Sequence, residues 1–284
     1  MSKYPSIRPE NYYDEYGEAE WERLDADPKT RYEFENTVAY LDERLPDSGH
    51  VLDAGGAAGR YAVWLAERGY EVTLADVSDT QRDIAREKAA EHGVADCVTV
   101  EHGDVRDLPY DEAAFDAVCC LGGPLSHVVD SLERARAARE LRRVAAPGAP
   151  VFVSVMGLVA VLQQLVRLAG EHEQEARQLP GLLDGGTYDA SLLADAGVTD
   201  PNFVECHFFR AAELRRLLTE AGLSVDTVAG LEGVASNAGA SLSDASETAL
   251  GHVDEVVTDP AFREDPTVAD LSEHILAVAI ARCR

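Results

Sequence analysis

One stretch of the sequence, residues 51–61, restricts the fold of the whole chain. It reads Val-Leu-Asp-Ala-Gly-Gly-Ala-Ala-Gly-Arg-Tyr, and a second short apolar run at 71–75 ends directly before Asp76. A buried run that stops at an acid, turns through glycines and continues as an amphipathic helix predicts a β-α-β unit with a nucleoside-type ligand site at the carboxyl ends of its strands. We expect Asp76 to accept hydrogen bonds from both hydroxyls of a ribose. A Cβ at Gly55 or Gly56 would fill the space that a closely approaching ligand needs.

The glycine turn does not match the dinucleotide fingerprint, which needs glycines at its first, third and sixth places. Counted from either of the first two glycines, the third and sixth places hold other residues. What is present is an acid followed by three glycines, at Asp53, Gly55, Gly56 and Gly59. This pattern resembles the first motif of the class I S-adenosylmethionine-dependent methyltransferases, with one departure at Ala57 and Ala58, where that family more often has a Gly-x or Gly-Pro pair.

The resemblance covers residues 51–155 in the order and spacing of its motifs, and the tail at 207–284 is consistent with the closing strands of that family. It implies a Rossmann-like, doubly wound α/β fold: a seven-stranded sheet of order 3-2-1-4-5-7-6, helices on both faces and an antiparallel last strand. We therefore expect a single methyltransferase domain over residues 1–284. Its expected parts are an N-terminal helical cap (1–48), a cofactor-binding core (49–156), an insertion or lid after the fifth strand (157–206), and a closing helix and strands (207–284).

The resemblance also implies S-adenosylmethionine as the cofactor, with S-adenosylhomocysteine as its product. The acid and glycines of the turn would contact the cofactor, as would Val77, with Asp76 at its ribose. Asp104 would accept a hydrogen bond from the adenine amino group, while the backbone N–H of Val105 meets a ring nitrogen. Leu121 ends the fourth strand, which in this family lies under the departing methyl group. The alternative for Asp104 is an ordinary acidic loop residue.

Two further residues are candidates near the reaction centre. Arg31 lies in the helix before the first strand, where some methyltransferases of this class use an arginine to bind the methionyl carboxylate; a solvated surface arginine is the alternative. A sulfonium methyl is already activated, so an enzyme mainly aligns the reacting atoms and needs a base only if the acceptor loses a proton early. His127, in the loop after the fourth strand, is the candidate base by titration range and position. A satisfied structural histidine is the alternative.

The segments outside the core give weaker signals. Residues 11–24 predict an acidic helix with aromatic residues at roughly helical spacing, which either packs on the domain or forms a flap over the cofactor. The insertion contains an apolar helix at 158–169 and then a long loop at 180–202, and it is either a substrate cover or a surface elaboration. Further on, residues 240–258 predict an acidic helix and residues 259–273 a loop.

The composition bears on the partners. A net charge of −27, with only Lys3, Lys29 and Lys88 as lysines, indicates adaptation to a high-salt cytoplasm and argues weakly against a nucleic-acid partner. No apolar run is long enough to span a bilayer, so we expect a cytoplasmic location and no membrane partner. The five cysteines have no zinc spacing, so no metal site is expected.

We conclude that the chain is predicted to be a methyltransferase for a small-molecule acceptor, methylated on oxygen, nitrogen or carbon. Two alternatives remain open: a tRNA or protein methyltransferase, and a non-catalytic nucleoside-binding module. The start of the turn resembles bacterial enzymes that methylate a carboxylate on a wobble uridine of tRNA, but over the cofactor half alone. The arginine-rich stretch at 134–143 is a conceivable phosphate-binding surface, with a solvated helix face as the alternative. The sequence leaves the acceptor and the oligomeric state undetermined.

Overall fold

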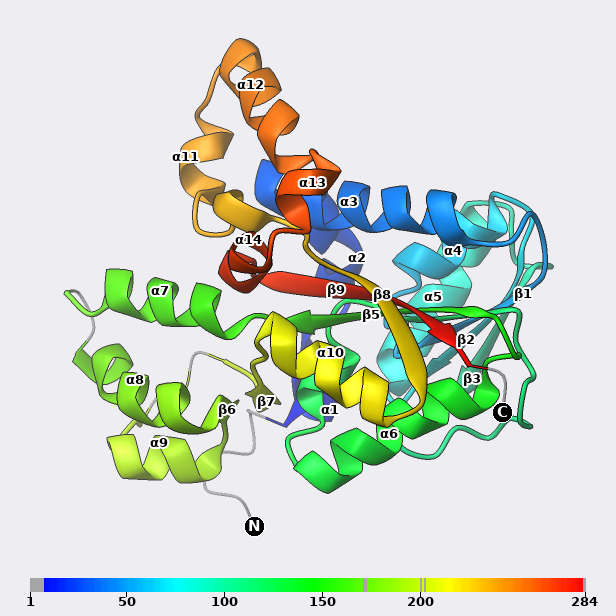
Figure 1. Cartoon of the computed structure of the whole chain (residues 1–284), viewed down its shortest axis with the longest axis horizontal. Coiled ribbons are helices and arrows are strands. Elements are labelled where there is room, and N and C mark those ends of the chain that lie inside the picture. Colours follow the sequence, from blue (N-terminus) through cyan, green and yellow to red (C-terminus); the bar gives the residue numbers. More distant parts are fainter. Residues whose placement is uncertain (1–7, 171–172, 200, 202, 283–284) are drawn as a thin grey trace.

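The computed structural model describes residues 8–170, 173–199, 201 and 203–282. At its centre is a seven-stranded sheet of order β3-β2-β1-β4-β5-β9-β8 (Figure 1). The strands are β1 (His50–Ala54), β2 (Glu71–Asp76), β3 (Val98–His102), β4 (Ala117–Cys120), β5 (Pro150–Met156), β8 (Leu223–Gly230) and β9 (His274–Ala281). β9 is antiparallel to both of its neighbours, and the other pairs are parallel. The predicted order and the antiparallel last strand are therefore confirmed.

The strand order reverses at β1, which pairs with β2 on one side and with β4 on the other. The helices that follow these strands are α4 (Arg60–Ala66), α5 (Asp79–Glu91) and α6 (Ser131–Val144). In an open α/β sheet a ligand crevice forms at such a reversal, outside the carboxyl ends of the strands. The fold thus places a crevice where the glycine turn follows β1.

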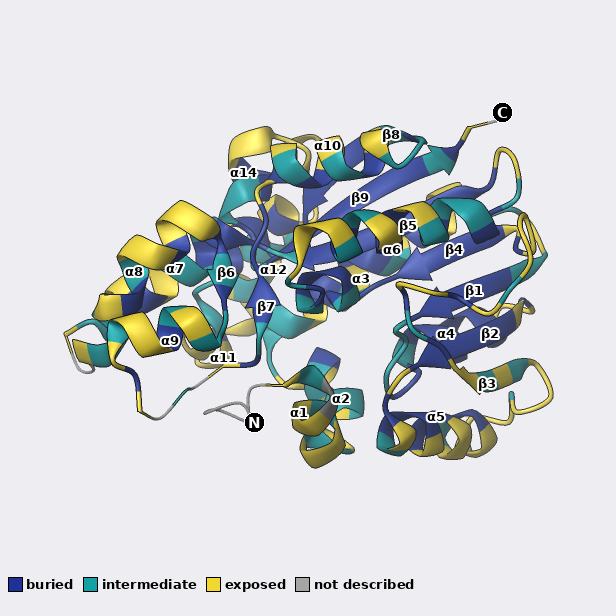
Figure 2. Ribbon diagram, turned by 90° about the horizontal axis from the view of Figure 1, so that it is seen from below, coloured by how far each residue is buried: buried dark blue, intermediate teal, exposed yellow. Residues whose placement is uncertain are grey.

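Both faces of the sheet are covered by helices, and its strands are mostly buried (Figure 2). On one face, Leu141 of α6 and Leu214 of α10 (Ala211–Glu220) share a core cluster with Phe115. A second cluster contains Leu41 of α3 (Pro28–Arg44) and Leu65 of α4. Strands that are covered on both faces need apolar side chains at nearly every position, which explains their continuous hydrophobic runs.

The N-terminal segment forms three short pieces rather than the single helix expected at 11–24. α1 (Pro9–Tyr16) ends at Gly17, whose φ of 56° breaks the helix, and α2 (Ala19–Glu22) and the 3-10 turn η2 (Arg23–Asp25) follow. Gln81 at the start of α5 donates through Nε2 to the backbone carbonyls of Tyr13 (2.8 Å) and Gly17 (3.1 Å). The segment is therefore packed beside the carboxyl end of β2.

The insertion is more regular than its composition suggested, and the loop expected at 180–202 was wrong. The chain forms α7 (Leu158–Leu168), α8 (Glu173–Gly185), β6 (Thr187–Tyr188), α9 (Ala190–Ala196) and β7 (Cys206–His207), with β6 and β7 paired. These elements have a core of their own around Leu165, Leu182, Leu193 and Phe208. Asp189 caps α9 by accepting from the Leu192 N–H at 2.8 Å. Burial of these leucines outweighs the weak helix propensity of the neighbouring glycine and aspartate residues.

The segment before the last strand is also helical, so the loop expected at 259–273 was wrong. After the 3-10 turn η4 (Gly233–Ala235) come α11 (Gly239–Ser243), α12 (Glu247–Val257), α13 (Pro260–Arg263) and α14 (Pro266–Leu271). The last two each begin with an aspartate N-cap followed by proline at the first helical position. That pair is a strong helix-start signal. Within the described residues, no helix has the length and apolar character needed to cross a membrane.

Candidate functional site

A cavity of about 320 Å³, called here the first cavity, lies at the carboxyl ends of β1, β2, β3 and β4. Its walls are the glycine turn after β1, the residues after the other three strands, and parts of α1, α2 and η2. The predicted site residues that line it are Gly55, Gly56, Asp76, Val77, Asp104, Val105, Leu121 and His127. Asp53, Gly59 and Arg31 do not line it. The structure therefore brings most of the predicted residues together around one space.

The glycines of the turn are required first by the packing of the protein itself. A Cβ at Gly55 would lie 2.5 Å from Cγ of Pro124, and a Cβ at Gly56 would lie 2.6 Å from Oδ2 of Asp53. Gly55 has a φ of 74°, which also disfavours other residues. Gly59 begins α4 with a φ of 85°. These glycines were expected to leave room for a ligand; they are also needed because a larger residue would collide with other parts of the chain.

Asp76 is the acid at the end of β2, and its carboxylate is fixed by the backbone. Oδ2 accepts from the N–H of Ala57 at 2.9 Å, and Oδ1 accepts from the N–H of Ser78 at 2.8 Å. Burial raises the pKa of Asp76, and these hydrogen bonds oppose that rise. The backbone of Val77 also interacts with this carboxylate. Two carboxylate oxygens together offer about four acceptor sites, so acceptor capacity remains for a ligand. The neighbouring Val77 is exposed and lines the cavity.

Asp53 lies beneath the turn and is fully buried. Burial and the neighbouring Asp76 carboxylate raise the pKa of Asp53 to about 7, and a contact with the backbone of Ala62 opposes them. Within the described chain, neither carboxylate oxygen has a hydrogen bond of ordinary geometry. Asp53 therefore supports the turn from below rather than forming a wall of the cavity.

Asp104 lies in the cavity wall after β3, and its carboxylate already has a partner. It accepts hydrogen bonds of 2.9 Å from both the backbone N–H and Nε of Arg106. Burial alone would raise the pKa of Asp104, but these hydrogen bonds and the guanidinium charge hold it below its usual value. An adenine amino group would have to share this carboxylate with Arg106. Val105, the next residue, and Leu121, which follows β4, are buried residues of the same cavity wall.

The structure places Arg23 at the cavity and leaves Arg31 on the surface. Arg31 lies on the exposed side of α3, because its neighbours Tyr32 and Glu33 occupy the buried side. Arg23 lines the cavity from η2 and donates to both Glu33 carboxylate oxygens at 2.5 and 3.1 Å, and to Glu20 at 3.2 Å. Sequence reasoning missed Arg23 because the break after α1, which turns it inward, has only Gly17 as a signal.

His127 lines the first cavity, and both of its ring nitrogens have partners. Nδ1 lies 3.0 Å from the carbonyl oxygen of Glu205, and Nε2 lies 3.0 Å from the Tyr13 hydroxyl. A carbonyl oxygen only accepts, so in the neutral ring Nδ1 carries the proton and Nε2 accepts from Tyr13. His127 therefore joins α1 to the end of the insertion. Tyr13, which the sequence analysis did not single out, is the phenol held by this contact.

A second cavity of about 160 Å³ adjoins the first. Both cavities are lined by Tyr13, Glu20, Arg23 and Gly122, which therefore form a common wall. The rest of the second cavity is mostly aromatic and apolar. It includes side chains of α1, the end of β5, α7 and the segment around β7, namely Tyr12, Tyr16, Met156, Val161, Phe203 and Phe208. The insertion thus supplies part of a second binding space.

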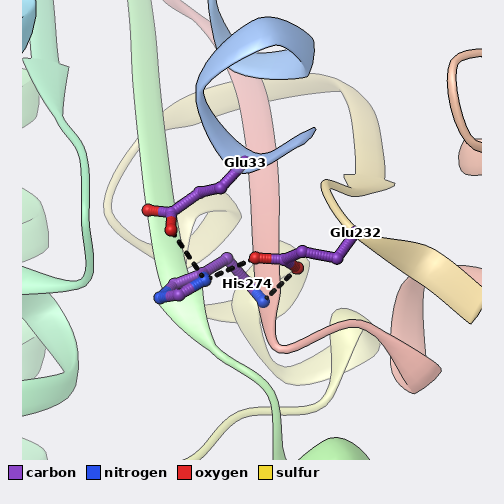
Figure 3. Close-up of side chains that lie close together, drawn as sticks. All are labelled: Glu33, Glu232 and His274. Carbon is purple, nitrogen blue, oxygen red and sulfur yellow. Dashed lines mark hydrogen bonds and ion pairs between the residues drawn. The ribbon is translucent and has the colours of Figure 1, made fainter. Parts of the chain in front are cut away.

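Three buried ionisable residues, Glu33, Glu232 and His274, form a cluster (Figure 3), and His274 also lines the second cavity. Nδ1 of His274 lies 2.6 Å from Glu232 and 3.4 Å from Glu33. Glu232 also accepts from the Ser272 hydroxyl (2.7 Å), while Glu33 is paired with Arg23. Burial alone would lower the pKa of His274, but the two carboxylates raise it to about 9. Arg23 and His274 are thus paired with the carboxylates of Glu33, Glu232 and Glu20, which identifies an internal ion-pair network.

This network predicts a pH dependence of stability. A histidine whose pKa is raised by folding stabilises the native state fully below its unfolded value of 6.5 and loses that contribution as the pH rises through about 9. We expect the free energy of unfolding to fall between these two pH values in urea titrations. Glu232→Gln removes one carboxylate charge and should flatten the decline. Identical profiles for the wild type and this variant would contradict the assignment.

The arginine-rich stretch lies on α6, and several of its arginines bind other groups of the same chain. Arg134 is buried and donates to two backbone carbonyls at 2.6 and 2.9 Å. Arg136 pairs with Asp107 at 3.0 Å, and Arg143 donates to Glu140 at 2.7 Å. These internal bonds favour a structural role over a phosphate-binding surface.

Comparison with known proteins agrees with this geometry. Residues 51–148 match a family described as a methyltransferase domain. The methyltransferase GfsG of Streptomyces halstedii is 35% identical over 123 residues, which are 42% of this chain and 43% of that protein. A ubiquinone biosynthesis O-methyltransferase of Xanthomonas axonopodis pv. citri is 29% identical over 196 residues, or 68% of this chain and 71% of that protein.

A solved structure has the same fold over most of the chain. It is that of an S-adenosylmethionine-dependent methyltransferase from Methanosarcina mazei, which has a TM-score of 0.60 and covers 86% of this chain and 98% of its own. At 18% identity, this similarity shows a shared fold. The match to the Streptomyces protein spans less than half of that protein's length.

Proposed function

We propose that this chain, which belongs to the class I S-adenosylmethionine-dependent methyltransferases, transfers a methyl group to a small molecule bound in the second cavity. The observation that carries the proposal is the common wall of the two cavities at Tyr13, Glu20, Arg23 and Gly122. One space lies at the carboxyl ends of the strands, where nucleoside ligands bind in such sheets. The other is about half its volume and is lined largely by aromatic and apolar side chains.

The residues of the first cavity fit the cofactor. Asp76 keeps acceptor sites for ribose hydroxyls, and Arg23 brings a guanidinium to the wall for a carboxylate. Asp104 and Val105 are available for an adenine edge, with Leu121 as an apolar surface. We propose Arg23 in the role that the sequence suggested for Arg31. Asp53 and Gly59 act through the turn, since neither lines the cavity.

The chain's own contribution to the reaction is mainly positional. When bound, the cofactor supplies a methyl group that is already activated by the sulfonium. Gly122 follows the end of β4 and lines both cavities, so its backbone allows close approach between their contents. Tyr13 also lines both, and its hydroxyl donates to His127. We propose that His127 positions Tyr13, because both ring nitrogens already have partners.

The cofactor assignment is tested by thermal melting in molar KCl, a medium chosen because the net charge is −27. We expect S-adenosylhomocysteine and S-adenosylmethionine to raise the melting temperature, because a ligand bound by the native state alone stabilises it by about 2.7 kcal/mol at a hundredfold excess over its dissociation constant. NAD serves as the control and should give no shift, since the turn lacks the dinucleotide fingerprint. A shift with NAD alone would overturn the proposal.

A further inference from the structure

His274 is the ionisable group of the cluster that also lines the second cavity. Its Nδ1 edge is turned toward Glu33 and Glu232, while the rest of the ring points away from both carboxylates (Figure 3). The hydrogen bond of 2.6 Å from Nδ1 to Glu232 fixes both the ring plane and the proton on that nitrogen. Nε2 makes no hydrogen bond with any residue that the structure describes. Because His274 lines the second cavity, we place this remaining donor at the edge of that space.

The surroundings of this donor favour a flat, apolar molecule. Tyr12 and Tyr16 come from α1, and their rings are stacked with centroids 5.4 Å apart. Phe203, Phe208 and Met156 lie on other sides of the same cavity. Aromatic and thioether side chains make favourable contacts with ring systems. Besides these side chains and His274, the second cavity is lined by polar residues, namely Glu20, Arg23, Gln164, Asn237 and Glu273. A few placed polar groups among apolar walls are the arrangement that orients a small ligand.

We propose that His274 binds an anionic oxygen carried by an aromatic acceptor, either a phenolate or an aromatic carboxylate, in the second cavity. The proposal rests on methyl transfer as the proposed function and narrows its acceptor class. Below the pKa of His274, which lies at about 9, Nε2 carries a proton and the ring a positive charge. An anionic oxygen then receives a charge-assisted hydrogen bond, while its ring contacts the aromatic walls.

The charge balance of the transfer follows from this binding mode. The lone pair of the anionic oxygen forms the bond to the methyl carbon, and the carbon–sulfur bond breaks with its electron pair kept by sulfur. An anion and a sulfonium give an ether or ester and a neutral thioether. The proton of a phenol leaves to water beforehand, since Nε2 is already protonated.

The charged groups around His274 come from several elements. Glu33 of α3 and Glu232 after β8 raise its pKa, while Arg23 of η2 lowers it. Glu20 of α2 also interacts with it electrostatically. Glu273, the preceding residue, is paired with Lys29 at 2.7 Å. Arg23 and Glu20, which line the same cavity, are paired with each other, and Arg23 is also paired with Glu33, so these charges are largely compensated by their partners.

The test uses the full chain saturated with S-adenosylhomocysteine and four probes that share one ring. Benzoate and 4-nitrophenol supply the two anionic oxygens, benzyl alcohol is a neutral analogue, and benzylamine is a cation. We expect calorimetric titration near neutral pH to show the two anions binding roughly tenfold or more tightly than benzyl alcohol, as a charge-assisted hydrogen bond predicts. The absorbance of 4-nitrophenol should show a lowered pKa when it is bound. Which of the two anions binds more tightly separates the phenol and carboxylate classes.

Variants distinguish the role of His274 from general damage. His274→Gln should abolish the preference for anions while leaving the affinity for S-adenosylhomocysteine unchanged, and His252→Gln, at an exposed histidine of α12, is the matched control. If His274→Gln does not fold, Glu232→Gln is the deciding variant. It keeps an acceptor for Nδ1 but removes the negative charge that raises the pKa of His274. The preference for anionic probes should therefore disappear at a lower pH than in the wild type, where that pKa is about 9.

Three results would overturn the inference: tighter binding of benzylamine, equal binding of all four probes, or an unchanged preference in His274→Gln. The inference would also be contradicted if Glu232→Gln lost its preference for anions at the same pH as the wild type. Failure of S-adenosylhomocysteine to bind contradicts the proposed function instead, because that ligand occupies the first cavity. The two failures are therefore distinguishable.

Discussion

Replacing Asp76 with alanine should weaken the binding of S-adenosylhomocysteine by at least roughly a hundredfold, because two hydrogen bonds to a charged carboxylate contribute about 1.5–3 kcal/mol each. The carboxylate is held by the N–H groups of Ala57 and Ser78 at 2.9 and 2.8 Å, so it is already oriented before a ligand arrives. Alanine removes the ligand contacts and also leaves these two donors without their acceptor. Isothermal titration calorimetry measures the effect.

The control for this variant is Asp83→Ala on α5, which changes the charge equally at an exposed carboxylate paired with Arg86. Its affinity should match that of the wild type. Asp76→Asn keeps one acceptor oxygen and should lose less affinity than the alanine variant. If a folded Asp76→Ala protein bound the ligand within twofold of the wild type, the ribose role of Asp76 would be excluded.

Gly157→Ala should destabilise the whole chain, by about 3 kcal/mol or more, because a Cβ there overlaps with backbone rather than with a movable side chain. It would lie 2.0 Å from the carbonyl oxygen of Ser272 and 3.2 Å from its carbon. Gly157 also joins β5 to α7, and its N–H donates to the carbonyl of Glu273 at 2.8 Å. The two segments must separate to admit one methyl group. Urea denaturation measures the loss.

The matched control is Gly251→Ala, where the added Cβ meets nothing within 4 Å. Gly251 is exposed in the middle of α12, so alanine should stabilise the chain by up to about 1 kcal/mol through its helix propensity. Replacing glycine with alanine is thus expected to lower the free energy of unfolding at position 157 and to raise it at position 251. A wild-type unfolding midpoint for Gly157→Ala would show that the contact with Ser272 is not tight.

The fold was predictable because its signals are local and repeated. The acids Asp53 and Asp76 mark the ends of β1 and β2, and helix starts carry recognisable caps, such as Ser78 and Asp130. The helices α13 and α14 had the same kind of signal in their Asp-Pro starts, which the loop expected at 259–273 overlooked. By contrast, α8 and α9 depend on burial of leucines against one another, and no short-range pattern encodes that burial.

Site residues that belong to strand ends of the sheet could be predicted from the sequence. Site residues that are brought together from distant segments could not. Asp76 and Asp104 follow strands directly, so the sheet alone places them. Arg23 is turned inward by the break at Gly17, whereas Arg31 lies on the exposed side of α3, and neither placement is evident from the residue types alone. His274 becomes notable only because Glu33 and Glu232, far away in the sequence, pack against it. Pairings of this kind are properties of the tertiary structure.

Tyr13 belongs to the walls of both cavities, and its hydroxyl is held by His127, which in turn contacts the carbonyl of Glu205 in the insertion. A displacement of this wall by a ligand in one cavity changes the shape of the other cavity as well. If the nucleoside ligand changes the dissociation constant of the acceptor by some factor, the acceptor changes the dissociation constant of the nucleoside ligand by the same factor. Any such coupling would pass through a side chain of the N-terminal helix α1, outside the sheet that holds the rest of the first cavity.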